Sequence, residues 1–192
     1  AWAYLFTQYF EAMGFEVDTD KLYTTMFKAA LSGASDCGGL AGFNYFSGEP
    51  VTGFDEGRPV FIRDVNADFS FANFMRLHLY SAVSTLKYGL DILFNEEEVK
   101  VDKLYGHGGF FKTEEVGQRI MSAACGGPVT VMKTAGEGGA WGIALLALFS
   151  VLEEKTSLAD YLNNVIFAGE EGTTITADAG EVEGFYKFME TF

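Results

Sequence analysis

The stretch VDKLYGHGGFFKTEEVGQRIMSAACGGPVTVMK, residues Val101–Lys133, decides the fold. It opens with a short apolar strand pattern that ends in glycines around a histidine. A run with helical spacing, TEEVGQRIMSAACG, follows, and PVTVMK then returns to the composition of a strand. Because alternation of strand and helix is typical of parallel α/β sheets, the segment predicts an α/β domain.

Three glycines, Gly106, Gly108 and Gly109, stand at the exit of the first of these strands. Glycine permits a tight turn, and it also lets a ligand approach the backbone closely. Ligands of open α/β sheets bind at the carboxyl ends of strands, where the N–H groups of the next helix also point. Neither familiar phosphate motif fits, because Phe111 takes the third glycine position of G-x-G-x-x-G and Lys112 follows a phenylalanine. The residues alone leave a nucleotide site and a structural turn open.

The residues before this segment also show helical and strand patterns. AWAYLFTQYFEAMG and DKLYTTMFKAAL have helical spacing, with Asp18 or Asp20 as the cap of the second helix. AGFNYF and RPVFIR have the composition of strands. The strongest helix begins near Ser70, and His78 on its apolar face is expected to be a hydrogen-bonded histidine of the core or its rim. That face comprises Phe71, Phe74, Met75, His78, Leu79, Ala82, Val83, Leu86, Leu90 and Leu93.

The segments after Lys133 continue the alternation. GGAWGIALLALFSVL is a strongly apolar helix pattern, and the tail, residues 169–192, combines the short strand TTITA with the amphipathic helix EGFYKFMETF. No repeat or long linker interrupts the sequence, so residues 1–192 are predicted to form one domain with residues 1–33 as its leading helices. The chain opens at Ala1 inside a helical pattern, and we therefore expect it to be a piece of a longer protein.

Composition and charge restrict the partners. The formal net charge is −14, which argues against nucleic acid because phosphates need clustered Lys and Arg. No apolar run approaches about 18 residues without a charge, so no membrane span is expected. Two cysteines, Cys37 and Cys125, and two histidines are too few for a structural zinc site, and no metal ligands are predicted. Free cysteines suit the cytoplasm.

From Gly108 onward the sequence resembles the C-terminal domain of the FGGY carbohydrate kinases, most of all the pentulose kinases such as xylulokinase and ribulokinase. The shared features are a Gly-Gly turn with a basic and a small polar residue, a later Gln, a Pro-Val pair, and Glu-x-Gly-Ala-x-Gly before a small-residue helix. Upstream, NYFSGEPVTGFDEGRP resembles the Ser-Gly-Glu turn of the family. The matching positions are Glu49, Gly108, Gly109, Lys112, Thr113, Gln118, Pro128, Val129, Glu137, Gly139, Ala140, Gly142 and Ala144.

This resemblance implies a ribonuclease-H-like, actin-like ATPase domain with a mixed sheet and flanking helices. The chain would be the C-terminal, ATP-side half of a cytoplasmic kinase that transfers the γ-phosphoryl group of ATP to a sugar, such as xylulose or ribulose. Mg²⁺ would bind with the ATP, and the sugar would bind mostly to the missing N-terminal domain of the same protein. A homodimer is compatible with this interpretation, and the alternative is a non-catalytic nucleotide-binding or interaction module of the same fold.

By the same resemblance, Gly108 and Gly109 begin an adenosine-binding motif that also includes Phe110, Lys112 and Thr113. Phe110 stands where the family usually has a small residue, so its ring is expected either to stack on adenine or to fill the adenine slot; we expect stacking. An aromatic contact of this kind contributes on the order of 1 kcal/mol beyond burial.

Other matching residues are expected to have structural roles. Glu137 is a candidate helix cap, Glu49 is expected to hold a turn, and Gly139 and Gly142 are expected to permit close helix packing at a hinge. No catalytic residue is expected in this chain, because the base and the phosphate loop of these kinases lie in segments that it lacks. Asp36, in GASDCGG, is expected to be a loop residue.

Overall fold

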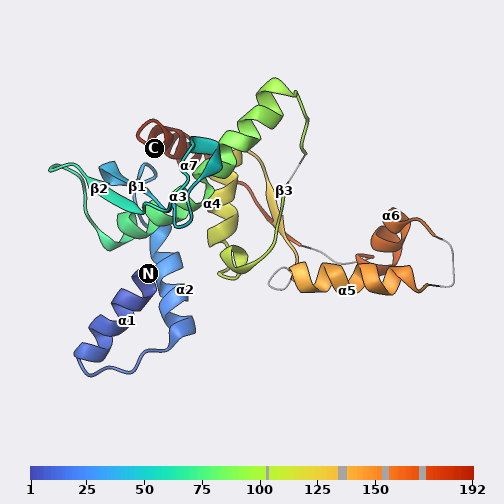
Figure 1. The fold of residues 1–192 in the computed structure, drawn as a ribbon, viewed down its shortest axis with the longest axis horizontal. Helices are drawn as coiled ribbons and strands as arrows, with labels where there is room; N and C mark the ends of the chain where they lie inside the picture. Colours follow the sequence, from blue (N-terminus) through green and yellow to red (C-terminus); the bar gives the residue numbers. More distant parts are fainter. Residues whose placement is uncertain (103, 134–137, 153–155, 169–171) are drawn as a thin grey trace.

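The computed structural model describes residues 1–102, 104–133, 138–152, 156–168 and 172–192, and it shows a mixed sheet flanked by helices (Figure 1). The helices and strands follow the predicted order closely. They are α1 (Trp2–Ala12), α2 (Thr19–Ala30), β1 (Leu40–Phe43), β2 (Val60–Arg63), α3 (Phe71–Asp91), β3 (Leu104–Gly106), α4 (Val116–Cys125), β4 (Val129–Val131), α5 (Gly138–Ser150), α6 (Leu158–Tyr161), β5 (Thr173–Ile175) and α7 (Ala179–Met189).

The sheet next to the glycine turn has the order β3-β4-β5 within the described residues. β3 and β4 are parallel, with Leu104 opposite Val129, as the strand–helix–strand pattern predicts. β5 joins the other edge of β4 in the antiparallel direction, with Thr173 opposite Val131. The sheet is therefore mixed, while β1 and β2 form a separate antiparallel pair.

Helix α3 is the centre of the core. It packs against α2, α4 and β1, and its Tyr80 ring contacts those of Phe185 and Phe188 of α7, with centroid distances of 4.8 and 5.4 Å. Because α3 is covered on several sides, its buried surface is wider than the predicted stripe. Four residues of the predicted apolar face are exposed instead, and this part of the prediction is wrong: Phe71, Ala82, Leu86 and Leu93.

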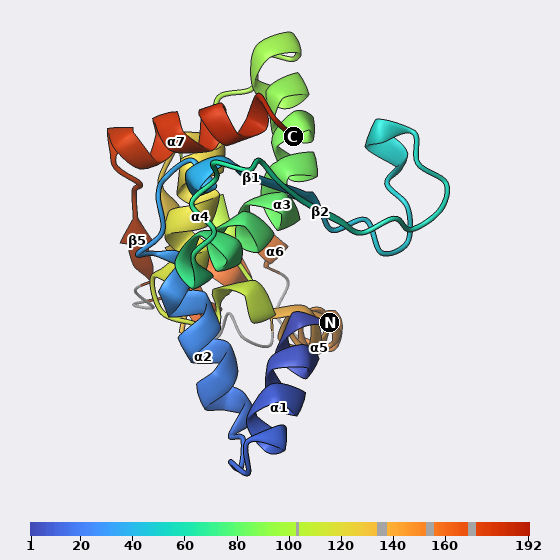
Figure 2. The same ribbon diagram turned by 90° about the vertical axis from the view of Figure 1, so that its left-hand side faces the viewer.

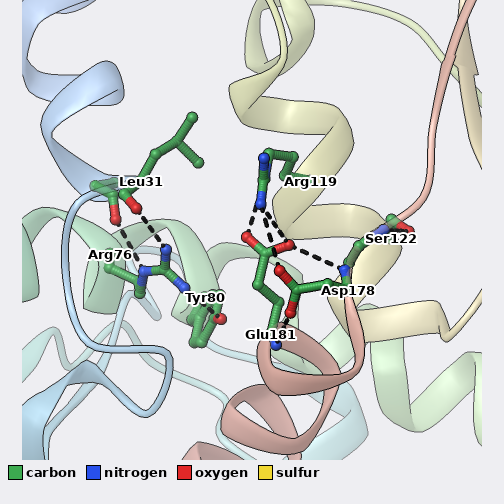
Figure 3. A network of polar contacts seen from close by, with 9 residues as sticks. Leu31, Arg76, Tyr80, Arg119, Ser122, Asp178 and Glu181 are labelled. Carbon is green, nitrogen blue, oxygen red and sulfur yellow. Dashed lines mark hydrogen bonds and ion pairs between the residues drawn. The ribbon is translucent and has the colours of Figure 1, made fainter.

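The buried surface of α3 includes charged side chains, and these form hydrogen bonds or ion pairs. Arg76 is buried and donates from Nε to the carbonyl of Ala30 and from Nη2 to that of Leu31, at 2.8 and 3.1 Å. These carbonyls lie at the C-terminal end of α2, where carbonyl groups have no N–H partner within the helix. Arg76 therefore fixes the end of α2 to α3 (Figure 3).

Helix α4 is fixed to α7 by a second arginine. Arg119 Nη2 lies 2.9 Å from a carboxylate oxygen of Glu181, and Nε donates to the other oxygen at 3.0 Å (Figure 3). Asp178 caps α7 in a capping box with Glu181. The same helix start thus binds Arg119 and orders its own first turn.

Two helices remain largely uncovered. α1 has no buried residue and forms a hairpin with α2 that projects from the body in Figures 1 and 2. α5 lies with α6 at one end of the molecule, and its Ile143 side chain is 71% exposed. Among the described residues, no helix has the length and apolar character that a membrane crossing requires.

Candidate functional site

The turn between β3 and α4 is built on a left-handed glycine. β3 ends at the buried Gly106, and Gly108 has φ of +95°, a value that side-chain-bearing residues rarely adopt. A single 3₁₀ turn, Gly109–Phe111, follows, closed by hydrogen bonds from Phe111 N to Gly108 O and from Lys112 N to Gly109 O. We call residues 108–113 the glycine turn.

The two phenylalanines of the glycine turn pack against other parts of the domain. Phe111 occupies the space beside Gly106 and Gly117: a Cβ on Gly106 would lie 2.5 Å from the Phe111 ring, and one on Gly117 would lie 2.4 Å from the carbonyl oxygen of Phe110. Phe110 packs edge-on against Phe27 of α2, with ring centroids 6.3 Å apart. Gly106 and Gly117 are thus required for close packing.

Gly108 and Gly109 have the opposite surroundings. A Cβ built on either glycine would meet no atom of the described residues within 4 Å, so both face space that this part of the chain leaves open. Lys112 is exposed and Thr113 is half-buried on the same turn. The structure therefore brings together an open glycine backbone, a cationic side chain and a hydroxyl group at the exit of β3.

An apolar cavity of about 320 Å³ adjoins this turn. Its wall includes His107, which directly precedes Gly108, and Trp141 of α5, whose ring lies 5.7 Å from that of Phe167. Gly138 allows α5 to approach, because a Cβ there would lie 2.8 Å from His107 Nδ1. The remaining lining residues are Gly138, Gly142, Leu145, Leu146, Leu162 and Phe167.

Most other residues singled out from the sequence have structural surroundings. Gln118 is buried, and its Nε2 donates to the carbonyls of Val129 and Thr173, which joins β4 to β5. Glu49 accepts from Val51 N in a turn, as predicted. Gly139 and Gly142 lie on α5 with open space beside them, and the expected hinge packing stays a prediction. Glu137 lies outside the described residues.

Asp36 is a loop residue, as predicted. Its carboxylate accepts from Gly38 N at 3.0 Å and binds Lys187 Nζ at 2.5 Å. The hydrogen bond from Lys187 lowers the pKa of this carboxyl group below its usual value, so Asp36 is a poor proton acceptor at neutral pH.

The described residues include no group of three or more His, Cys, Asp or Glu side chains that could hold a metal ion. Burial raises the pKa of the Cys37 thiol and that of Cys125, so neither cysteine is set up as a nucleophile.

Two features of the site could not be found from the sequence. The contact between Phe27 and Phe110 joins positions far apart in the chain, and the cavity wall includes Leu162 and Phe167 from a segment with weak periodicity. Both arise from tertiary packing, which local spacing does not encode. The unusual Phe-Phe pair after two glycines was the only local signal.

Solved structures with the actin-like ATPase fold match this arrangement. The xylulose kinase from Rhodospirillum rubrum has a TM-score of 0.64 and 16% identity over 90% of this chain and 33% of its own. Gluconate kinase from Lactobacillus acidophilus has a TM-score of 0.62 and 17% identity over 86% and 32%. Plasmodium falciparum glycerol kinase, solved with ADP, has a TM-score of 0.64 and 14% identity over 98% and 36%. The chain spans about a third of the length of these proteins.

The family follows from the sequence match. A model of the C-terminal domain of the FGGY family of carbohydrate kinases matches residues 1–151, which is most of the chain. The chain therefore belongs to the FGGY family of carbohydrate kinases, as the motifs indicated. A comparison with curated protein sequences gives no match.

Proposed function

We propose that this chain is the ATP-side domain of a cytoplasmic carbohydrate kinase that transfers the γ-phosphoryl group of ATP to a sugar hydroxyl. The observation that most supports this proposal is the open glycine turn at the exit of β3 in a chain of the FGGY family. We further propose a ketopentose such as xylulose or ribulose as the substrate. The xylulose kinases among the similar structures favour this class, beside the gluconate and glycerol kinases.

The proposed nucleotide-binding residues are Gly108, Gly109, Phe110, Lys112 and Thr113. They fit a nucleoside phosphate because the two glycines leave their backbone uncovered and the neighbouring cavity is apolar, as a planar base requires. The Lys112 ammonium group would attract the phosphates, and the Thr113 hydroxyl can donate or accept a hydrogen bond to the base.

The chemistry of these residues indicates which steps this domain performs and which belong to the rest of the protein. ATP would supply the phosphoryl group, and the Mg²⁺ bound with it would shield the negative charge of the phosphates. This domain binds and orients the nucleoside, and the cavity beside His107 excludes water from the base. The base that takes the proton of the sugar hydroxyl, and most sugar contacts, would belong to an N-terminal domain of the same protein. Phosphoryl transfer requires both parts to be positioned together.

A second candidate is a non-catalytic nucleotide-binding or interaction module of the same fold. The observation in its favour is Phe110, an aromatic residue at a usually small position of the motif. The two candidates differ in turnover, because the module would bind its ligand without sugar-dependent release of ADP.

Replacing Gly109 by valine tests the nucleotide site. The backbone at Gly109 is not left-handed and its Cβ position is empty, so Gly109→Val should fold with a Tm close to that of the parent. If adenosine lies along the turn, the branched side chain should raise the KM for ATP about tenfold in the full-length enzyme and leave the KM for sugar nearly unchanged.

Gly127→Val is the matched control, because Gly127 also faces open space and lies away from the glycine turn. It should change neither KM. Equal effects of Gly109→Val on both substrates, or no effect, would show that the glycines only form a turn. Coupled ADP-release assays with pentuloses, hexuloses and polyols then identify the sugar and separate the kinase from the non-catalytic module.

A further inference from the structure

We propose that Phe27 and Phe110 are positioning residues for the nucleotide: the contact between their rings fixes the place of Gly108 and Gly109 and thereby sets nucleotide affinity. This inference rests on the proposed function, since it concerns the same turn. It assigns to the Phe110 ring neither of the two roles expected from the sequence, which were stacking on the base and filling its slot.

The geometry of the turn separates an inner side from an open side. Phe110 is half-buried and packs against the main hydrophobic core, where its ring meets Phe27 at 68° and Phe111 at 81°. Gly108 and Gly109 have no neighbours at their Cβ positions. The ring is thus engaged with the protein, while the adjoining glycine backbone is the part left open to a ligand.

Phe27 is a fixed support for this contact. It lies on α2 between two buried residues of the same helix, Met26 and Ala30. The C-terminal carbonyls of α2 are bound by the buried Arg76 guanidinium (Figure 3). Because close-packed interiors deform little, the Phe27 ring on this anchored helix can restrain the position of the turn that packs against it.

The C-terminal end of the turn has a separate anchor. The Phe111 ring fits against Gly106 and Gly117, and α4, which begins shortly after it, is bound to α7 through Arg119. Gly108 and Gly109 lie between this anchor and the end of β3, and the φ of Gly108 is left-handed. The Phe110 ring directly follows Gly109 and packs against Phe27 of α2, so its removal should let these glycines shift.

Three roles of Phe110 predict three different patterns of mutants. If the ring stacks on the base, Phe110→Ala weakens nucleotide binding but Phe27→Ala does not. If it fills the slot, Phe110→Ala strengthens binding. If it positions the turn, both alanine variants weaken binding by similar factors, and the double variant is no weaker than either single one, because both remove the same contact.

The experiment measures the Kd of MgATP and of MgADP by titration calorimetry for the full-length protein and the variants Phe27→Ala, Phe110→Ala and the double variant. We expect each to weaken binding about threefold to tenfold, the range that corresponds to one aromatic pair. The KM for ATP should rise by the same factor while the KM for sugar stays unchanged. Phe43→Ala is the control: it removes another half-buried ring, one that contacts Tyr45 and Phe192. It should lower Tm without altering either Kd.

The failure of this inference differs from the failure of the proposed function. If the parent protein binds neither nucleotide, the proposed function is overturned. If the parent binds and Phe27→Ala binds equally well, only the positioning role is overturned, and additive losses in the double variant overturn it too. Should an alanine variant lose its cooperative melting transition, Phe27→Leu and Phe110→Leu keep the apolar volume but not the ring contact, and the same pattern is expected of them.

Discussion

His78 lies on α3 in contact with the rings of Trp2 and Phe74, and its two nitrogens have unequal surroundings. Nδ1 is 3.2 Å from Asn44 Oδ1, so it carries the proton of the neutral ring. Nε2 is buried and has no hydrogen-bond partner among the described residues. Burial therefore favours the neutral form and lowers the pKa of His78 to about 4. The expected hydrogen-bonded histidine is confirmed, but with one nitrogen unsatisfied.

Stability should depend on pH through this residue. The unfolded chain binds a proton at His78 near pH 6.5, whereas the folded chain resists it until about pH 4. The contribution of neutral His78 is thus complete above pH 6.5 and decreases as the pH falls towards 4. His78→Phe keeps the ring contacts and cannot titrate, so the Tm of the parent should decrease more steeply than that of the variant between pH 6.5 and 4.5. Parallel Tm curves would contradict this.

Single residues show where sequence reasoning succeeds. The loop residue Asp36 was predicted, and Asp18 was one of the two candidate caps of α2, because each depends on local backbone chemistry. The burial of Arg76 was not predicted, since it depends on the free carbonyls of α2 lying beside α3. Polar residues in a core are satisfied by neighbours that are distant in sequence.

At the scale of elements, Gln118 strengthens the pairing of β4 and β5, which few backbone hydrogen bonds hold together. β4 and β5 are three residues long each, and the Gln118 amide donates to the carbonyl of Val129 in one and of Thr173 in the other. A side chain of α4 thereby binds the helix to two strands at once. This gives a structural reason for the glutamine of the motif.

Gln118→Leu should lower the free energy of unfolding by about 2 kcal/mol, because two carbonyl groups lose their donor in a buried place. Urea denaturation measures this difference. Gln8→Leu on the uncovered α1 is the matched control and should change the free energy by less than about 0.5 kcal/mol. Equal losses in the two variants would show that the amide bridge contributes nothing.

The order and type of the longer elements could be predicted because their apolar spacing is regular. The antiparallel direction of β5 and the short helix α6 could not, since strand direction depends on the path of the chain between strands. The site was predicted to the extent that glycines after a strand mark an open backbone. The cavity wall that α5, Leu162 and Phe167 add to it was not predicted.

At the scale of the whole molecule, two apolar surfaces are uncovered at once. One is a cavity of about 560 Å³ between α1, α2 and α3, lined by Leu5, Phe6, Tyr9, Phe10, Leu22, Thr25, Met26 and Phe71. The other is α5, where Ile143 is 71% exposed and carries no charged neighbour on the helix. Exposed apolar surface on this scale is typical of sites that contact another molecule.

The purified 192-residue chain should therefore fold but show no sugar-dependent ATP turnover. The core around α3 joins residues from α2 to α7, whereas no described residue is placed as a base. A coupled ADP-release assay with a panel of pentuloses checks this, with a cooperative melt as the control for folding. Measurable turnover by this chain would contradict the prediction and direct attention back to Asp36.

The packing of Tyr80 against Phe185 and Phe188 has a consequence for biosynthesis. Tyr80 leaves the ribosome long before α7 does, so Tyr80 lacks these two contacts while β3, α4, β4 and α5 are translated. Contacts between such distant parts of a chain form slowly, and nascent apolar helices attract chaperones in the meantime. Translation that stalls before residue 185 should therefore leave a nascent chain that a protease digests readily.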